Sequence, residues 1–213
     1  MDIIYCFDKN YKEMAVKSAE SVLKYNPEAN IHYFCPYDIN LPELEEFTED
    51  LCGFKHVSRA CFLRLLIPKY YCDLDKALYL DCDTLCQGSL KPLFDIDFDN
   101  NYLLATRGYK YSDFQAQQLG LPWYIISGML MFNIPLMNEE NYFQQIKNNW
   151  RGALGKQEPF SADETIINWC FHNKIKLVDE KWNYCLNRDY GDRKCDNPQI
   201  LHVIGTDKSR MFE

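Results

Sequence analysis

The sequence predicts a single α/β domain whose central sheet is mostly parallel, because short apolar runs alternate with amphipathic segments along the chain. Its 213 residues are enough for one hydrophobic core, and no linker, repeat or low-complexity tract divides them. Hydrophobic residues make up 47% and charged residues 25%, which is ordinary globular usage and excludes a disordered or fibrous chain. We therefore expect one domain over residues 1–213.

The expected strands are apolar runs between turn residues. Residues 3–7 are continuously apolar, which is typical of a strand covered on both faces. Six further strands are predicted at residues 30–35, 76–81, 101–106, 129–134, 174–178 and 199–204. Sheets of this kind bind ligands at the carboxyl ends of their strands, so the residues after positions 7, 81 and 204 are candidates for a site.

The expected helices lie between these strands. The first covers residues 11–25, where Ala15, Ala19 and Val22 share one face, and Asn26-Pro27 ends it. Further helices are predicted from Pro42 to about residue 51, over 58–71 with a disturbance at Pro68, and over 139–150 and 163–173. Aromatic side chains between residues 102 and 124 are interpreted as partial core and as a mobile loop, where they could stack on a ligand.

The charge balance narrows the partners. Lys+Arg 23 against Asp+Glu 31 gives a net charge of −8, which argues against a nucleic-acid binder. No run approaches the roughly 18 apolar residues of a membrane span, and neither a signal peptide nor a basic tail is seen, so we expect at most peripheral membrane contact. The ten cysteines are too few for a disulfide scaffold, and we expect free, mostly buried thiols in a cytoplasmic protein.

Two acids, Asp81 and Asp83, follow a strongly apolar strand. In extended geometry residues i and i+2 point to the same side, and two converging carboxylates repel unless a cation lies between them. Carboxylate oxygens suit Mg²⁺ or Mn²⁺, which in turn bind phosphates. The functional interpretation is a metal–diphosphate site, and the alternative is a solvated turn after a strand.

Two phosphoryl chemistries use such an acidic pair. One is aspartyl-phosphate hydrolysis of the haloacid-dehalogenase type, whose signature places a threonine one position later than Thr84. The other is nucleotide-sugar transfer. The remaining motifs favour the second.

Seven segments in order then carry a resemblance to a known family. They are residues 3–11, 18–27, 62–68, 81–83, 127–133, 163–168 and 202–208. Together they resemble the family 8 retaining glycosyltransferases, the group that contains glycogenin and bacterial lipopolysaccharide galactosyl- and glucosyltransferases. The resemblance implies a GT-A fold, a Rossmann-like mostly parallel sheet flanked by helices. It also implies a nucleotide-binding half at residues 1–85 and a sugar and acceptor half at 86–213.

The resemblance implies a metal site of Asp81, Asp83 and His202. Mn²⁺ tolerates one nitrogen ligand better than Mg²⁺ does, so manganese is expected and magnesium is the alternative ion. The competing interpretation of His202 is a core histidine that ends a strand. The spacing of Gly205 and Lys208 after it favours the metal site.

The same resemblance implies contacts to the UDP-sugar. Asp8 and Tyr11 would hold uracil and ribose, and Gly205 and Lys208 would lie against the diphosphate. The alternatives are a plain turn and helix start for the first pair and a mobile cation for Lys208. The full expected set is Cys6, Phe7, Asp8, Tyr11, Arg64, Asp81, Cys82, Asp83, Ser127, Gly128, Gly205 and Lys208.

Three residues are expected to take part in catalysis. Arg64 lies among apolar residues and needs an anion, either the diphosphate or Asp163, unless it snorkels to the solvent. Asp163 would grip sugar hydroxyls. Glu164 falls where the family usually has Gln, and it could act as a nucleophile or bond the sugar.

The implied reaction moves glucose or galactose from a UDP-sugar to a saccharide or glycolipid acceptor, in surface polysaccharide or lipopolysaccharide synthesis. Two departures from the family pattern are Ile126 in place of Asn and the absence of an acid near Arg107. They leave a nucleotide-sugar-binding pseudoenzyme or complex subunit as the alternative. The sequence predicts neither the acceptor nor the oligomeric state.

Overall fold

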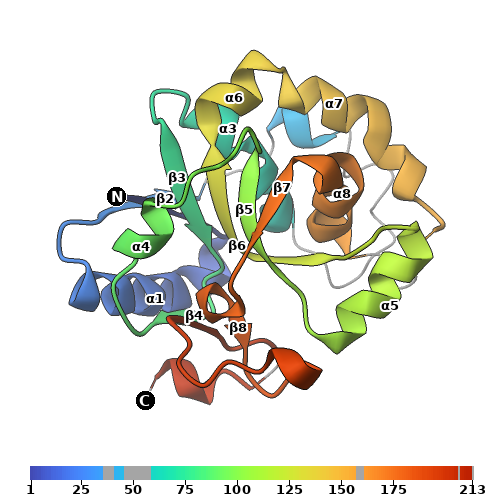
Figure 1. Cartoon of the computed structure of the whole chain (residues 1–213). Coiled ribbons are helices and arrows are strands. Elements are labelled where there is room, and N and C mark those ends of the chain that lie inside the picture. Colours follow the sequence, from blue (N-terminus) through green and yellow to red (C-terminus); the bar gives the residue numbers. More distant parts are fainter. Residues whose placement is uncertain (36–40, 46–58, 157–160, 206, 213) are drawn as a thin grey trace.

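The computed structural model describes residues 1–35, 41–45, 59–156, 161–205 and 207–212, and its centre is a six-stranded sheet of order β2-β1-β3-β6-β5-β7 (Figure 1). Strand β6 is antiparallel to both β3 and β5, and the other pairings are parallel. Five of these six strands therefore run in one direction, as the sequence predicts. The strands are β1 Asp2–Cys6, β2 Asn30–Phe34, β3 Lys76–Leu80, β5 Leu103–Arg107, β6 Ile125–Asn133 and β7 Ile175–Val178.

A second, smaller sheet has the order β4-β9-β8. Its strands are β4 Thr84–Cys86, β8 Tyr184–Cys185 and β9 Ile200–His202. The antiparallel register pairs Thr84 with His202, and β8 is parallel to β9. This pairing brings a segment near the end of the chain beside the turn that follows β3.

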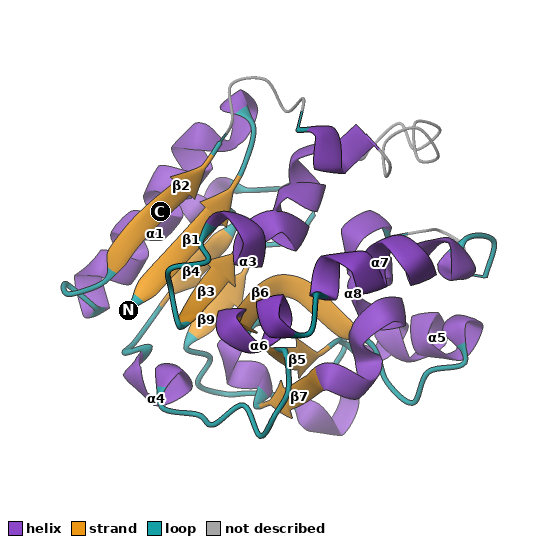
Figure 2. Ribbon diagram, turned by 90° about the horizontal axis from the view of Figure 1, so that it is seen from above, coloured by secondary structure: helices purple, strands orange, loops and turns teal. Residues whose placement is uncertain are grey.

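Side chains alternate along each central strand and form two cores. Ala77 and Tyr79 of β3 belong to one core, whereas Leu78 and Leu80 belong to the other. Helices α1 and α4 pack on the second face, and α3, α6, α7 and α8 pack on the first (Figure 2). The helices are α1 Lys12–Tyr25, α3 Ile67–Tyr70, α4 Lys91–Phe94, α5 Lys110–Leu119, α6 Ile134–Glu139, α7 Tyr142–Asn149 and α8 Ala162–Phe171.

Two of the expected helices are interrupted in the structure, one near a proline and the other at a residue with positive φ. Residues 58–71 were expected to be one α-helix, but Arg59–Leu66 is a 3₁₀ helix, and Pro68 lies in the first turn of α3, where its missing N–H costs nothing. Residues 139–150 are likewise not one helix, because Asn141 adopts φ +52° between α6 and α7. In the helix expected over 42–51, residues 42–45 are helical and residues 46–51 lie outside the described residues. Position 58, the expected start of the helix over 58–71, also lies outside them.

The segment between residues 102 and 124 is more ordered than expected. It contains helix α5 where a mobile loop was predicted. Tyr102 and Tyr124 are fully buried and cannot stack on a ligand, whereas Tyr111 and Phe114 are exposed on α5. Only part of the aromatic content of this segment is therefore available to a sugar.

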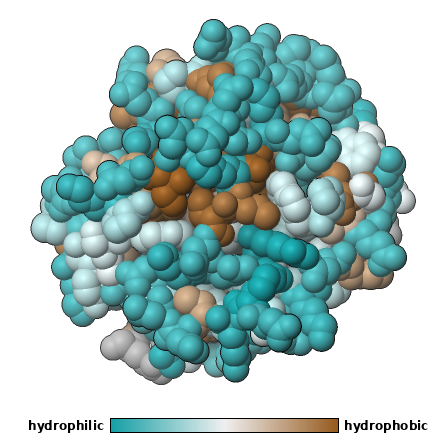
Figure 3. All heavy atoms as spheres, viewed as in Figure 1, coloured by the Kyte–Doolittle hydropathy of each residue, from teal (hydrophilic) through white to brown (hydrophobic). Residues whose placement is uncertain are grey.

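The nine described cysteines form no disulfide with one another; Cys6, Cys82, Cys86 and Cys185 are buried, Cys35, Cys61, Cys170 and Cys195 are half-buried, and Cys72 is exposed. Within the described ranges, no helix has the length and apolar character that a membrane crossing requires. The face seen in Figure 3 is mostly hydrophilic, with apolar residues gathered in a band across its middle.

Candidate metal and nucleotide-sugar site

A tight turn after β3 places the two acids. The strand ends at Leu80, one residue earlier than expected, and the Thr84 N–H donates to the Asp81 carbonyl at 3.2 Å. The Thr84 hydroxyl donates to the same carbonyl at 2.8 Å. Extended geometry predicts that Asp81 and Asp83 point to the same side. In the structure, a hydrogen-bonded turn brings the two acids together instead.

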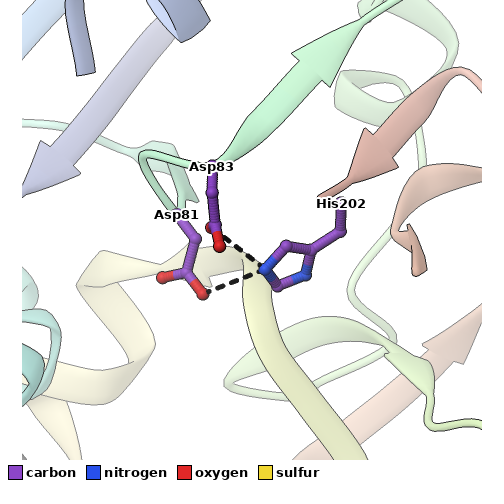
Figure 4. Close-up of side chains that lie close together, drawn as sticks. All are labelled: Asp81, Asp83 and His202. Carbon is purple, nitrogen blue, oxygen red and sulfur yellow. Dashed lines mark ion pairs between the residues drawn. The ribbon is translucent and has the colours of Figure 1, made fainter. Parts of the chain in front are cut away.

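His202 completes a three-residue cluster with these acids (Figure 4). Its Nε2 lies 3.1 Å from Asp83 Oδ1 and 3.5 Å from Asp81 Oδ2. One ligand atom from each of the three residues falls within 4.8 Å of the others. The Val203 N–H, which donates to the Asp83 carbonyl at 2.8 Å, fixes β9 against the turn.

Each carboxylate keeps one oxygen for this cluster and gives the other to a basic side chain. Asp81 Oδ1 accepts from the Tyr79 hydroxyl and lies 3.0 Å from the Arg64 guanidinium. Asp83 Oδ2 pairs with the Lys208 ammonium. Two oxygens and one imidazole nitrogen therefore face a common point, which is a donor set suited to Mn²⁺ or Mg²⁺.

The charges of the cluster are strongly coupled. Burial alone would raise the pKa of Asp83, but the His202 imidazole and the Lys208 ammonium outweigh it and hold this pKa well below its usual range. Burial alone would lower the pKa of His202, but Asp83 and Cys185 raise it well above its usual value. Without a metal, the imidazolium therefore serves as the counter-charge of the acids.

Arg64 is a buried bridge and does not snorkel, since it is 8% exposed. Its Nε lies 3.0 Å from Asp163 Oδ2, and its Nη1 donates to the carbonyl and hydroxyl of Ser127, both at 2.9 Å. The guanidinium also lies 4.5 Å from the centre of the Tyr79 ring. Although burial would lower the pKa of Arg64, Asp163 and Asp81 raise it well above its usual value, so the charge is permanent.

An irregularity in β6 presents Ser127 and Gly128 to the site. Ala105 pairs with Leu130, but Arg107 pairs with Ile125, so extra residues of β6 lie between these two pairings. The Ser127 N–H donates to Glu164 Oε2 at 2.9 Å. Burial raises the pKa of Glu164 to about 7, although this hydrogen bond opposes the rise.

A cavity of about 370 Å³ adjoins the cluster. Nine residues of the expected site lie in its wall: Cys6, Phe7, Asp8, Tyr11, Arg64, Asp81, Cys82, Asp83 and Asp163. They come from the end of β1 and the 3₁₀ helix Lys9–Tyr11 that follows it, from the turn after β3, from the 3₁₀ helix Arg59–Leu66 and from the start of α8. The carboxyl ends of β1 and β3 thus meet at one cavity, as the sheet rule predicts.

The remaining expected residues lie beside the cavity or away from it. Ser127 of β6 accepts from Arg64, Glu164 of α8 accepts from the Ser127 N–H, and Gly128 of β6 lies against His202. Lys208 contacts Asp83, and Gly205 is an exposed residue with φ +101°, a backbone conformation that favours glycine.

Several residues of the site were missed by the sequence argument. Tyr79 has a sequence signal, because it lies two residues before Asp81, near the end of β3. Asn183 and Cys185 contact His202 only through the pairing of the two-residue strand β8, which has no clear sequence signal. The other additions to the cavity wall are Ala60, Cys61, Ser161 and Ala162.

Comparison with known proteins assigns this fold and site to a family. The sequence model of Glycosyl transferase family 8 matches residues 44–209, so the chain belongs to that family. This membership confirms the resemblance and overturns the phosphatase alternative. The acidic pair and His202 are all present and converge, and no finding supports the pseudoenzyme alternative.

Curated relatives include enzymes of lipopolysaccharide synthesis. The lipopolysaccharide 1,3-galactosyltransferase of Salmonella typhimurium is 26% identical, with 97% of this chain and 72% of that protein covered. The lipopolysaccharide glucosyltransferase WaaO of Escherichia coli is 25% identical, with 98% and 72% covered. A Haemophilus influenzae protein, provisionally assigned as a glycosyltransferase, is 28% identical, and this chain spans 63% of its length.

The fold recurs in solved structures. The galactosyltransferase LgtC, in complex with donor and acceptor sugar analogues, superposes with a TM-score of 0.80 at 23% identity, covering 96% of this chain and 87% of that one. The chain therefore has the GT-A fold, as expected.

Proposed function

We propose that this protein is a metal-dependent retaining hexosyltransferase, which moves glucose or galactose from a UDP-sugar to a saccharide or glycolipid acceptor. The observation that carries the proposal is the convergence of Asp81, Asp83 and His202 at one end of a cavity. The galactosyl- and glucosyltransferase relatives support a hexose donor and a role in surface polysaccharide or lipopolysaccharide synthesis. We further propose that it acts in the cytoplasm.

Asp81 Oδ2, Asp83 Oδ1 and His202 Nε2 would hold the divalent ion. Their oxygen and imidazole chemistry fits Mn²⁺, with Mg²⁺ as the alternative. When bound, the ion would neutralise negative charge on the departing diphosphate. Arg64 and Lys208 keep the second oxygen of each acid occupied, which aims the first oxygen at the ion.

The nucleotide would occupy the cavity beside β1. Asp8 and Tyr11 lie in its wall, and Tyr11 is 45% exposed, so its ring would be available to stack on the base. Residues 1–85 would form the nucleotide-binding half, and residues 86–213 the sugar and acceptor half. Lys208 and the backbone at Gly205 would lie along the diphosphate.

The donor sugar would lie next to Asp163 and Glu164. Asp163 is held by Arg64, so its remaining oxygen can accept bonds from sugar hydroxyls. Glu164 is held by the Ser127 N–H and would stabilise positive charge that develops at the anomeric carbon. Both carboxylates are positioned by hydrogen bonds before substrate arrives, which lowers the cost of reorganisation.

The acceptor would enter on the side of His202, opposite the nucleotide. Tyr109 is half-buried and packs against the cluster of Ile126, Cys185 and Tyr190, next to His202. Its ring is a candidate to contact the acceptor sugar.

The experiment that tests the proposal measures nucleotide-sugar binding and turnover together. UDP-glucose and UDP-galactose should raise the melting temperature in the presence of Mn²⁺ but much less without it, and slow UDP release should follow. D83N should abolish Mn²⁺-dependent UDP release. D73N, the same change at an exposed acid at the opposite end of β3, should behave as wild type. Release by D83N at the wild-type rate would overturn the proposal.

A further inference from the structure

The two nitrogens of the His202 ring face different surroundings. Nε2 faces Asp83 and Asp81, whereas Nδ1 lies 3.1 Å from Asn183 Oδ1 and 3.8 Å from Cys185 Sγ. The imidazole is 4% exposed and Asn183 is 1% exposed, so water does not compete for these contacts. The Nδ1 side of the ring therefore depends on two protein groups.

The amide of Asn183 is held in one orientation. Its Nδ2 donates to the Ile126 carbonyl at 3.3 Å, which leaves Oδ1 directed at His202. Its backbone N–H donates to the Glu180 carbonyl at 3.1 Å, and the Cys185 N–H that follows donates to the Tyr190 hydroxyl at 2.9 Å. The position of Asn183 Oδ1 is therefore fixed by the hydrogen bond of its own amide nitrogen and by those of the neighbouring backbone.

An amide oxygen can only accept a hydrogen bond, so Asn183 Oδ1 favours the ring form that carries its hydrogen on Nδ1. A neutral imidazole with its hydrogen on Nδ1 presents a lone pair at Nε2, the atom that faces the two acids. The thiol of Cys185 is farther away and is a weak partner, so it does not determine the ring form.

We infer that Asn183 is a positioning residue, which sets the tautomer and orientation of His202 so that Nε2 can bind the divalent ion. The inference rests on the proposed metal site and adds to it a residue that never touches the substrate. Asn183 acts through His202 alone, by accepting the Nδ1 hydrogen.

The test compares three variants by direct titration of Mn²⁺, with the free ion followed by electron paramagnetic resonance. N183L removes the acceptor at similar volume and should weaken Mn²⁺ binding by about 10- to 100-fold. N183D restores an acceptor at the same place and should recover most of the affinity. N197L makes the same change at an exposed asparagine and should stay within about threefold of wild type.

A second readout reports the ring form itself. In the Mg²⁺-loaded wild type, a long-range proton–nitrogen spectrum should show the His202 hydrogen on Nδ1, and in N183L this single form should be lost. Wild-type Mn²⁺ affinity in N183L, or an N183D variant as weak as N183L, would overturn the inference. If D83N loses Mn²⁺ while N183L keeps it, the proposed metal site stands and only the inference fails. A wild-type chain that binds no Mn²⁺ would overturn both.

Discussion

Gly128 lies directly against the ring of His202. A Cβ atom at position 128 would stand 2.2 Å from Cε1 and 2.5 Å from Nδ1 of that ring, and 3.1 Å from Asp81 Oδ2. No side chain can be added there without moving a proposed metal ligand. The irregular segment of β6 therefore contributes to the site in two ways: Gly128 leaves room for the His202 ring, and Ser127 supplies hydrogen bonds.

The substitution G128A should weaken Mn²⁺ binding about tenfold or more, because forcing one methyl group into a packed site costs roughly 1–3 kcal/mol. Titration of Mn²⁺ measures this directly. The control is G155A: Gly155 has φ +73° but open space around its Cβ position, so alanine there should lower the melting temperature and leave Mn²⁺ affinity intact. Equal Mn²⁺ affinities in G128A and wild type would contradict the packing argument.

R64K should reduce the kcat/KM of UDP release by about a hundredfold, which corresponds to roughly 2.7 kcal/mol. Lysine keeps the charge but cannot reach Asp81, Asp163 and Ser127 together, as the planar guanidinium does. Steady-state kinetics provide the measurement, and R151K, at an exposed arginine, is the matched control. Activity of R64K within threefold of wild type would show that the bridge is dispensable.

E164Q should stabilise the metal-free protein at pH 8 relative to wild type, and much less at pH 4.5. The pKa of Glu164 is raised by burial to about 7, so the folded state holds a proton that the unfolded chain loses above about pH 4.5. Stability linked to this group is full below that pH and falls as the pH rises to 7. The loss is at most about 3 kcal/mol. Urea unfolding at the two pH values measures it, and an equal E164Q effect at both would contradict the assignment.

Much of this site could be predicted from sequence, because its residues follow strongly patterned strands. The apolar runs before Asp8 and Asp81 identified both strands, and the sheet rule then placed their ends together. Family motifs added Arg64 and His202, which no periodicity argument would have joined to the acids. Local pattern and motif order together predicted nine of the residues that line the cavity.

The parts that sequence did not reveal depend on long-range pairing or on weak patterns. Strand β8 is two residues long, so its pairing with β9, and hence the contact of Asn183 with His202, leaves no periodic signal. Helix α5 has few apolar residues on its buried face, which includes Ser112 and Gln115, and it was therefore interpreted as a loop. In each case tertiary contacts, rather than local preference, determine the conformation.

The most direct measurement of the central claim is a crystal structure of the protein with Mn²⁺ and UDP, with the ion located by its anomalous signal. The account predicts one strong manganese peak bound by Asp81, Asp83 and His202, with the diphosphate on its open side and the nucleoside along Asp8 and Tyr11. A peak elsewhere, or these three ligands turned away from a bound UDP, would contradict it.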